Sequence, residues 1–472
     1  MIKLYNTLTR KLEDFKPIKN GFVGIYSCGP TVYWNQHIGH MYAYVQWDAL
    51  IRFLGYSGFK TKWVMNITDV GHMTSDEDTG QDKMEKGAKR ENLSVWEIAD
   101  KYIKQFTESL DLLNIKRPDI LCRATGHIKE QIDLIKKIEK NGFAYKTKTG
   151  LVFDTSRFPG YAKFARLNLK DQFAGARTEI DKEKKKPWDF LLWVTNQPNH
   201  IMQWDSPWNR GFPGWHIECT AMSTKHLGKV FDIHTGGKEH IPIHHTNEIA
   251  QAFGAFGKRT ANFWLHNEWL TLEGEKMSKS LGNNVLVTDL IAKGFNPLAL
   301  RYLIMTSHYR QGLNFTWRSL KGAEKALIGL YMTAARLWEE SSGSKSPKDN
   351  PLLRKKYTEE FVAYLSDDLN VAKCLGLIWK VLKDKNLSFK DRYELSINFD
   401  KVFGLRIAEN SRPSPSMPPI VIPSEVEKLV EQRENLRKEK QWQEADQIRK
   451  EVERLGWQIE DATEGPKIKP KS

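Results

Sequence analysis

The sequence has little cysteine and no long hydrophobic segment. Four cysteines occur among 472 residues: Cys28, Cys122, Cys219 and Cys374. A set this sparse and scattered cannot form a disulfide scaffold and is typical of a reducing compartment. No apolar run approaches the roughly 18 residues of a membrane span, and the first residues lack the apolar core of a signal peptide. We therefore expect a cytoplasmic protein that does not bind a membrane.

Acidic residues are outnumbered by basic ones. The chain carries 72 Lys and Arg against 58 Asp and Glu, which gives a net charge of +14. Such an excess suits a polyanionic partner, because each neutralised phosphate releases counterions. A basic balance can also serve solubility only, so charge alone leaves both interpretations open.

The first part of the sequence alternates strand and helix patterns. Residues 22–27 and 62–67 are short apolar runs typical of buried strands, with a helical pattern between them. This order predicts an α/β fold with a Rossmann-like parallel sheet. Two more strands are predicted much later, at 230–234 and 262–266. We therefore interpret residues 121–200 as an insertion that splits one α/β domain.

Two polar linkers divide the second half of the chain. Residues 341–347 are rich in serine, and residues 411–423 carry five prolines, which favour an extended linker. After about residue 290 we expect helices and no further strands. The predicted segments are 1–120, 121–200, 201–290, 291–345, 350–408 and 424–472.

Beyond the second linker, apolar residues recur every three or four positions. They are Trp442, Ala445, Ile448, Val452 and Leu455. This spacing predicts one amphipathic helix, whose apolar face packs on a helix at about 426–436.

A short histidine motif follows the first strand of the predicted sheet. His37 and His40 flank Gly39 where a helix is expected to begin, so both rings face the same way. A helix N-terminus at the carboxyl end of a strand binds anions. The histidines could therefore donate to phosphate, and Gly39 would let a flat ring approach the backbone. Taken alone, the motif also fits two surface histidines.

A second motif, KMSKS, occupies residues 276–280 between two glycines. Lys276 and Lys279 flank a serine in a loop that could close over a polyphosphate. Taken alone, this motif is better read as a solvated basic loop.

Together and in this order, the two motifs are far more specific. The sequence resembles class I aminoacyl-tRNA synthetases, whose HIGH and KMSKS signatures bind ATP. The CGPTVY of residues 28–33, the GWHIEC of 214–219 and the PIHHTNE of 242–248 narrow the resemblance to the cysteinyl-tRNA synthetase family. The similarity extends over nearly the whole chain, including the DDLN of 367–370.

The resemblance implies one zinc ion per chain, with Cys28, Cys219, His244 and Glu248 as its ligands. These residue types are suitable for zinc, and His244 and Glu248 are four residues apart, on one helical face. Spacing alone would favour two inert buried cysteines, because free cysteine is usually core. With the family motifs in register, we prefer the zinc site. Cys122 and Cys374 match no motif and are expected in the core.

The resemblance also implies a reaction and its partners. L-cysteine reacts with ATP, which Mg²⁺ accompanies, to give cysteinyl-adenylate and pyrophosphate, and cysteine then passes to the terminal adenosine of cysteine tRNA. His37, His40 and Lys279 are the implied catalytic residues; with Gly39 and Lys276 they form the ATP site. We expect segments 1–120 and 201–290 to form the catalytic domain, the following helical segments to hold the tRNA, and 424–472 to read the anticodon. We expect a monomer.

The sequence departs from the family around the amino-acid pocket. Thr68 and Trp215 match pocket positions, although each could be only a packed core residue. Glu239 stands where the family has an aspartate, which leaves the partner of the substrate ammonium open. Thr246 lies between presumed ligands without being one. Residues 71–80 look like an insertion, and a second metal site there, formed by His72 with Asp76 or Asp78, is less expected than a solvated acidic loop.

Two other functions are alternatives to the activity that the resemblance implies. Ligases of the mycothiol pathway also activate cysteine but join it to an amino sugar, and they need no anticodon reader. A non-catalytic tRNA-binding paralogue would have lost parts of the HIGH, KMSKS or ligand sets. The complete motifs and the region from 350 to 472 argue against both.

The proline-rich linker generates a first prediction. Truncation before Ser424 should spare cysteine-dependent ATP–pyrophosphate exchange and impair tRNA charging, because the linker separates an independently folded appendage. Both rates are measured on the full chain and on the truncated chain. A fall of exchange and charging by the same factor would place the tail within the catalytic fold.

Overall fold

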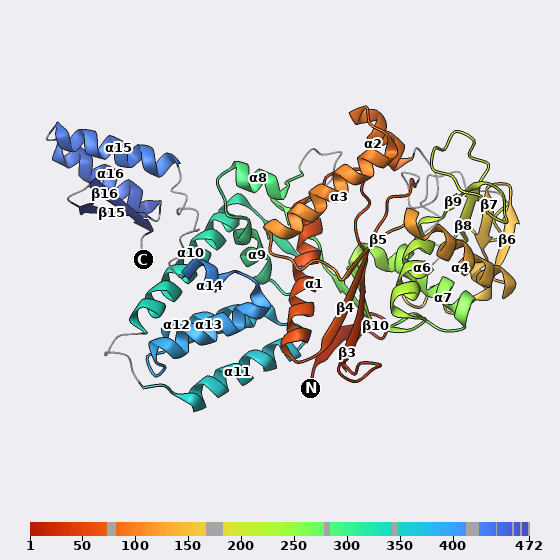
Figure 1. Cartoon of the computed structure of the whole chain (residues 1–472), viewed down its shortest axis with the longest axis horizontal. Helices are drawn as coiled ribbons and strands as arrows, with labels where there is room; N and C mark the ends of the chain where they lie inside the picture. Colours follow the sequence, from red (N-terminus) through yellow and green to blue (C-terminus); the bar gives the residue numbers. More distant parts are fainter. Residues whose placement is uncertain are drawn as a thin grey trace. The chain divides into compact units, whose positions relative to one another are not determined.

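The computed structural model describes nine stretches of the chain: 1–72, 82–166, 183–277, 284–341, 348–411, 424–439, 441–455, 457–462 and 465–470. The chain divides into two compact units (Figure 1). The first comprises Met1–Leu286, Ser307–Phe315 and Val362–Ala372, and the second comprises Val287–Thr306, Thr316–Phe361 and Lys373–Ser472. No described helix is both long and apolar enough to cross a bilayer. The segment boundaries predicted above remain predictions.

The first unit is built on a five-stranded parallel sheet, ordered β11-β10-β3-β4-β5. Its strands are β3 (Phe22–Ser27), β4 (Lys60–Ile67), β5 (Ile120–Arg123), β10 (Phe231–Gly237) and β11 (Ala261–Asn267). Ile25 of β3 pairs with Ile233 of β10. Two halves of the chain separated by a long insertion thus meet in one sheet, and the predicted Rossmann-like fold is confirmed.

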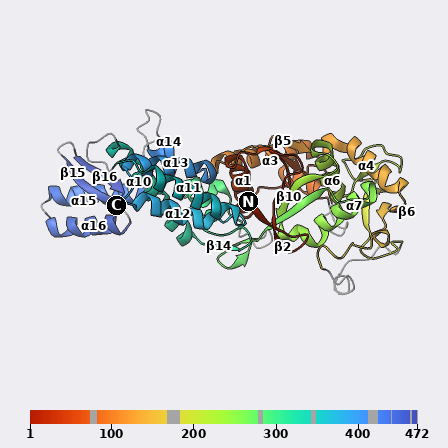
Figure 2. The ribbon, with the colours of Figure 1, turned by 90° about the horizontal axis from the view of Figure 1, so that it is seen from below.

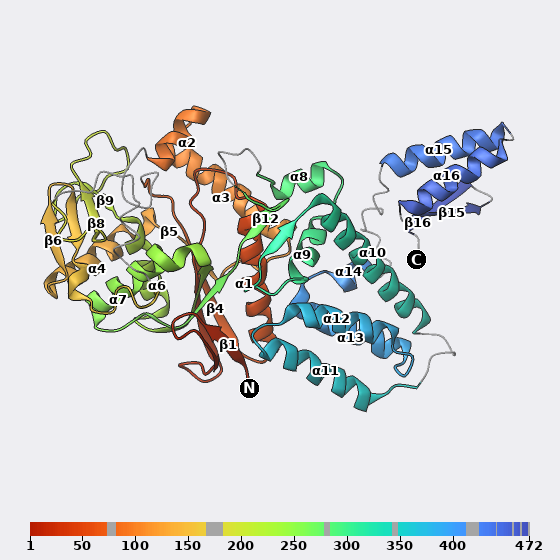
Figure 3. The ribbon, with the colours of Figure 1, turned by 180° about the vertical axis from the view of Figure 1, so that it is seen from behind.

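Helices connect the strands of this sheet. Helix α1 (Ile38–Tyr56) runs between β3 and β4, followed by α2 (Lys83–Glu91) and α3 (Val95–Leu112) before β5. Helix α1 begins at Ile38, within the histidine motif where a helix was expected to begin, because His37 caps it: Nδ1 accepts from the Gly39 N–H at 3.1 Å. The strand β12 (Leu270–Leu272) lies against α1 (Figure 3).

The insertion folds as a second, antiparallel sheet in the first unit, ordered β6-β7-β8-β9. Its strands are β6 (Ala144–Thr147), β7 (Gly150–Phe153), β8 (Phe190–Thr195) and β9 (Gly211–Pro213). Phe153 and Trp193 share one hydrophobic core with Leu134 of α4 (Ile128–Lys140), Ile217 of α6 (Trp215–Leu227) and Ala250 of α7 (Thr246–Phe256). Since α6 and α7 also flank β10, they tie the insertion to the central sheet.

Helices dominate the second unit (Figure 2). They are α8 (Val287–Ala292), α9 (Pro297–Met305), α10 (Trp317–Glu340), α13 (Phe389–Phe403), α14 (Ile407–Ser411) and most of α11 (Pro351–Ser366) and α12 (Val371–Lys383). The rings of Phe361 and Phe399 stack with centroids 4.1 Å apart and fix α11 against α13.

The C-terminal segment has a small core of its own. Helices α15 (Ser424–Lys438) and α16 (Trp442–Arg454) pack together, as predicted. Val426, Val430 and Val452 are buried there. Trp442 departs from the predicted apolar face, since 57% of it is exposed.

The expectation that strands end near residue 290 is wrong. The strands β15 (Trp457–Ala462) and β16 (Gly465–Pro470) form an antiparallel hairpin, and β14 (Leu313–Phe315) pairs with β12 in the first unit. These strands are short or carry alternating polar residues, so they lack the apolar runs from which the central strands were predicted. The remaining strands β1 (Lys3–Asn6), β2 (Lys11–Asp14) and β13 (Glu275–Lys276) are equally short.

A buried carboxylate joins three distant segments of the first unit. Asp368 is 4% exposed and has a left-handed backbone, with φ of 56°. Its carboxylate accepts from the Tyr5 N–H at 2.8 Å, the Tyr309 hydroxyl at 2.7 Å and the Arg310 Nε at 2.6 Å. Asp368, in the DDLN segment, therefore links the N-terminal strand β1 to residues 307–315.

This junction predicts a local loss of stability. Asp368→Ala should lower the free energy of unfolding of the first unit by about 2–4 kcal/mol, because the buried Tyr309 hydroxyl, the partly buried Tyr5 N–H and the Arg310 guanidinium all lose their acceptor. The neighbouring Asp367 is exposed, so Asp367→Ala is the matched control and should stay within about 0.5 kcal/mol of the unaltered chain. Urea unfolding measures both. Equal effects of the two substitutions would contradict this role for Asp368.

Candidate active site

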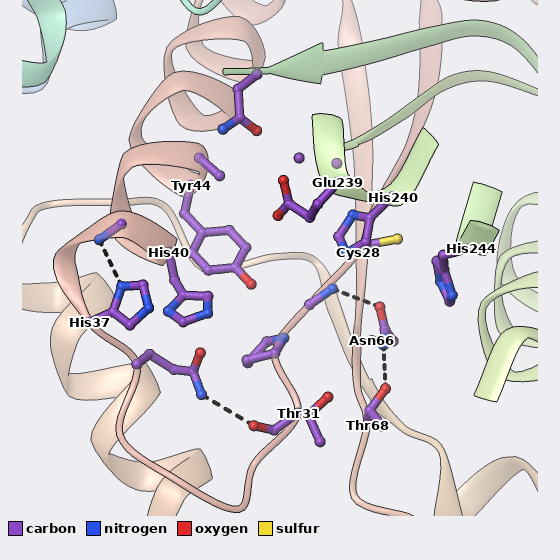
Figure 4. A pocket seen from close by; sticks show the side chains of 18 of the residues that line it. Cys28, Thr31, His37, His40, Tyr44, Asn66, Thr68, Glu239, His240 and His244 are labelled. Carbon is purple, nitrogen blue, oxygen red and sulfur yellow. Dashed lines mark hydrogen bonds between the residues drawn. The ribbon is translucent and has the colours of Figure 1, made fainter. Parts of the chain in front are cut away.

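A pocket of about 430 Å³ opens where β3, β4 and β10 end and α1 begins. This edge of a parallel sheet is where ligands bind in doubly wound folds. Figure 4 places His37 and His40 on one side of the pocket, and Cys28, His240 and His244 on the other. The predicted site residues that line it are Cys28, His37, Gly39, His40, Thr68, Trp215, Cys219 and His244.

The two histidines of the first motif lie together at the start of α1. Their ring centroids are 3.9 Å apart. His37 accepts through Nδ1 from Gly39, so a neutral ring carries its proton on Nε2, from which it can donate. The HIGH motif therefore places donors at a helix N-terminus, as an anion site requires.

The KMSKS segment approaches the same helix start. A Cβ atom on Gly39 would lie 2.7 Å from Cε of Met277 and 2.9 Å from the His37 ring, so a larger residue would force these side chains to shift. The Ile38 N–H donates to the Val285 carbonyl at 2.8 Å, on the far side of the loop. Lys276 ends β13, whereas its side chain and all of Lys279 lie outside the described part of the chain.

Four residues from four segments bring their ligand atoms together. Cys28 follows β3, Cys219 lies on α6, His244 lies in a π-helical turn at Ile241–His245, and Glu248 lies in the first turn of α7. One ligand atom from each lies within 4.8 Å of all the others, and all four residues are buried. The structure therefore assembles the set of residues predicted as metal ligands.

Two further histidines, which sequence analysis missed, lie in the same cluster. His234 and His245 form an alternative set with Cys28 and Glu248, again within 4.8 Å. His245 Nε2 lies 3.2 Å from the Cys28 sulfur, and its Nδ1 lies 2.7 Å from Nε2 of His266. With both ring nitrogens occupied, His245 supports the cluster from outside. Its place beside His244 in the sequence was the only available signal.

A chain of hydrogen bonds lies behind Cys28. Burial lowers the pKa of His245 and His266 well below the ordinary value, so both rings are neutral. The Thr7 hydroxyl lies 2.8 Å from His266 Nδ1. Where Cys28 is the thiolate that a metal would bind, its sulfur only accepts, and the order then runs from Thr7 through His266 to the Nε2–H of His245, which donates to Cys28. Such outer contacts orient metal ligands and fix their tautomers.

The carboxylate of Glu248 is the strongest sign that the cluster can hold a cation. Its Oε2 lies 3.0 Å from His234 Nε2. Its Oε1 is buried and has no hydrogen-bond partner among the described residues, although His244 Nε2 is 3.2 Å away. A buried carboxylate oxygen without a donor is costly. A metal ion at this point would supply the missing positive charge.

The pKa shifts of the two thiols and of His244 are compatible with a metal at this point. Burial raises the pKa of both Cys28 and Cys219, so without a cation they stay protonated. Burial also lowers the pKa of His244, which keeps the ring neutral with one nitrogen able to bind a metal. The Nδ1 of His244 lies 3.0 Å from Nδ1 of His216, so Nε2 is the nitrogen turned toward Glu248.

The remaining predicted pocket residues border this cluster. The ring of Trp215 lies 4.5 Å from that of His244. Thr68 is buried, and its hydroxyl donates to Glu218 at 2.8 Å. Glu239 is exposed at the pocket rim and accepts from the Trp269 indole N–H at 2.8 Å. His240 lines the same wall and was not predicted.

The structure also shows the contacts of Thr246 and His72, which the sequence analysis considered. Thr246 donates to the Ile241 carbonyl at 2.7 Å and is not in either ligand set. His72 Nε2 lies 2.5 Å from Glu218. Asp76 and Asp78, considered above with His72, lie outside the described residues.

Comparison with known proteins gives matches over almost the entire chain. Residues 14–325 match the family described as tRNA synthetases class I (C) catalytic domain, and residues 421–465 match the cysteinyl-tRNA ligase anticodon binding domain. The cysteine–tRNA ligase of Treponema denticola is 43% identical, covering 98% of each chain. That of Thermus thermophilus is 39% identical, also covering 98% of each.

A solved structure supports the fold. Methionyl-tRNA synthetase of Mycobacterium tuberculosis in complex with methionyl-adenylate superposes with a TM-score of 0.57 and 15% identity, covering 82% of this chain and 90% of that one. Together, the parallel sheet, the HIGH and KMSKS motifs and these near full-length matches show that the chain belongs to the cysteine–tRNA ligase family of class I aminoacyl-tRNA synthetases.

Proposed function

We propose that the pocket selects cysteine through a zinc ion held by Cys28, Cys219, His244 and Glu248. As a cysteine–tRNA ligase, the chain joins L-cysteine to cysteine tRNA at the expense of ATP. The Oε1 of Glu248, buried beside two cysteines without a hydrogen-bond donor among the residues described, is the observation that carries the zinc proposal. Two sulfurs, one nitrogen and one oxygen are a donor set that zinc accepts.

Zinc in this position explains how cysteine is told from serine. An apolar pocket separates substrates that differ so little by only about 10–200-fold. When bound, zinc would supply a soft Lewis acid that prefers thiolate to alcohol. The cluster reaches the pocket, because Cys28, Cys219 and His244 line its wall. Trp215 beside His244 then closes the side-chain space, and Thr68 completes this part of the pocket.

The first step takes place between the cluster and α1. The carboxylate oxygen of cysteine attacks the α-phosphorus of ATP, and the bond to pyrophosphate breaks. We assign His37 and His40 as donors to the phosphate oxygens, with Gly39 giving room for the nucleotide. We assign Lys276 and Lys279 to the leaving pyrophosphate, with Mg²⁺ accompanying ATP. Positioning and charge stabilisation account for this chemistry without an acid–base pair.

The second step passes the cysteinyl group to the terminal ribose of the tRNA. We propose that the helical segments 291–345 and 350–408 hold the tRNA, and that 424–472 reads the anticodon. The matched anticodon-binding domain supports the last assignment and disfavours an amino-sugar acceptor. Four free, buried cysteines suit a reducing cytoplasm. We propose that the chain acts as a monomer.

Cys219→Ser tests the zinc assignment. The variant should lose its zinc and its use of cysteine together while still binding ATP, because the cluster and the HIGH motif occupy opposite walls of the pocket. Zinc content, cysteine-dependent ATP–pyrophosphate exchange and equilibrium ATP binding are measured.

The control is Cys374→Ser, which changes a buried cysteine in the second unit, with its sulfur 3.6 Å from the Phe361 carbonyl. It should keep its zinc and its exchange activity. If Cys219→Ser retained a full zinc equivalent and used cysteine normally, the ligand assignment would be wrong.

A further inference from the structure

A second cluster of metal-ligating side chains lies at the start of α2, apart from the cysteine cluster. Asp82 caps α2, Glu85 lies in its first turn, and His200 belongs to the segment between β8 and β9. One ligand atom from each of these three residues lies within 4.8 Å of the others. Asp82 and His200 are 6% and 8% exposed, so they are almost fully withdrawn from water.

Each of the three side chains is held by the backbone through one polar atom. Asp82 Oδ1 accepts from the Glu85 N–H at 2.7 Å, and Glu85 Oε1 accepts from the Ile201 N–H at 2.8 Å. His200 Nδ1 lies 3.0 Å from the Met202 carbonyl. Hydrogen bonds of this kind orient ligands in metal sites. Each of the three side chains then has one further polar atom that could bind a shared ion.

The tautomer of His200 shows that a cation is needed there. A carbonyl only accepts, so Nδ1 must carry a proton, and Nε2 of the neutral ring offers a lone pair. That lone pair lies 2.8 Å from Oδ2 of Asp82, which is also an acceptor. Either a proton or a metal ion must lie between them. In an octahedral site, neighbouring ligands about 2.1 Å from one ion are about 3 Å apart, which is close to this spacing.

Burial favours a cation beside Asp82. Asp82 is 6% exposed, so its carboxylate is poorly hydrated, and a buried charge without a partner is expensive. Glu85 is partly exposed and would add a second carboxylate to the same ion. The ring of His200 stacks on Phe212, with centroids 3.8 Å apart, so water cannot solvate that face.

We infer that Asp82, Glu85 and His200 bind a second divalent metal ion, one that accepts imidazole together with carboxylates, as Mn²⁺ does. The ion would join the start of α2 to the segment that leads into β9. Lys83, next to Asp82, lines the pocket, and its Nζ lies 5.6 Å from the centre of the Trp215 ring. The second metal would therefore hold Lys83 beside the amino-acid pocket.

Mn²⁺ is a selective probe, because it prefers oxygen and nitrogen ligands to thiolates. The zinc-loaded full chain is titrated with Mn²⁺ in the absence of ATP, and free Mn²⁺ is followed by its six-line electron paramagnetic resonance spectrum. We expect one Mn²⁺ bound per chain. Glu85→Gln, which keeps an acceptor for Ile201 but loses the charge, should weaken binding by at least about 10-fold.

A matched substitution separates this site from surface carboxylates in general. Glu130 also lies in the first turn of a helix and is partly exposed, so Glu130→Gln should bind Mn²⁺ like the unaltered chain. His200→Gln should abolish binding; if it fails to fold, the partly exposed Glu85 still provides the test. Equal affinities of the unaltered chain and Glu85→Gln, or no bound Mn²⁺ at all, would show that His200 and Asp82 share only a proton.

Discussion

The convergence of two thiols, an imidazole and a carboxylate on one buried point is the constraint on which the rest of the site depends. Glu248 is fully buried, and its Oε1 has no hydrogen-bond donor among the described residues. A group of this kind is stable only beside a positive charge. The fold must therefore bring residues from both halves of a divided domain to within bonding distance of one ion.

The parallel pairing of β3 with β10 achieves this. Cys28 follows the end of β3, and its N–H donates to the Thr235 carbonyl of β10 at 3.1 Å, so the cysteine is fixed at the junction of the two halves. The turn after β10 then delivers His244 and Glu248, and α6 delivers Cys219 from the other side. Helix α1 begins at the same edge of the sheet. The candidate metal cluster and the HIGH motif are therefore close because the sheet is continuous.

Much of this arrangement could be predicted from local sequence. Apolar runs marked β3 and β10, and a parallel sheet places their carboxyl ends together. The ligand residues, however, were recognised from their motifs, since spacing alone favoured inert cysteines. What could not be predicted depends on contacts across long distances in the chain. His245 touches Cys28 across 217 positions, and no local pattern shows that contact. The hairpin of β15 and β16 was missed because its residues lack an apolar run.

The central claim is that substrate sulfur binds the metal directly. X-ray absorption at the zinc edge, with and without cysteine, measures the number of sulfur atoms around the ion. Two cysteine ligands are available in the cluster. The account predicts that added cysteine raises the sulfur count by one, whereas added serine leaves it unchanged. An unchanged count with saturating cysteine would make the zinc a structural clamp only, and would place the discrimination elsewhere in the pocket.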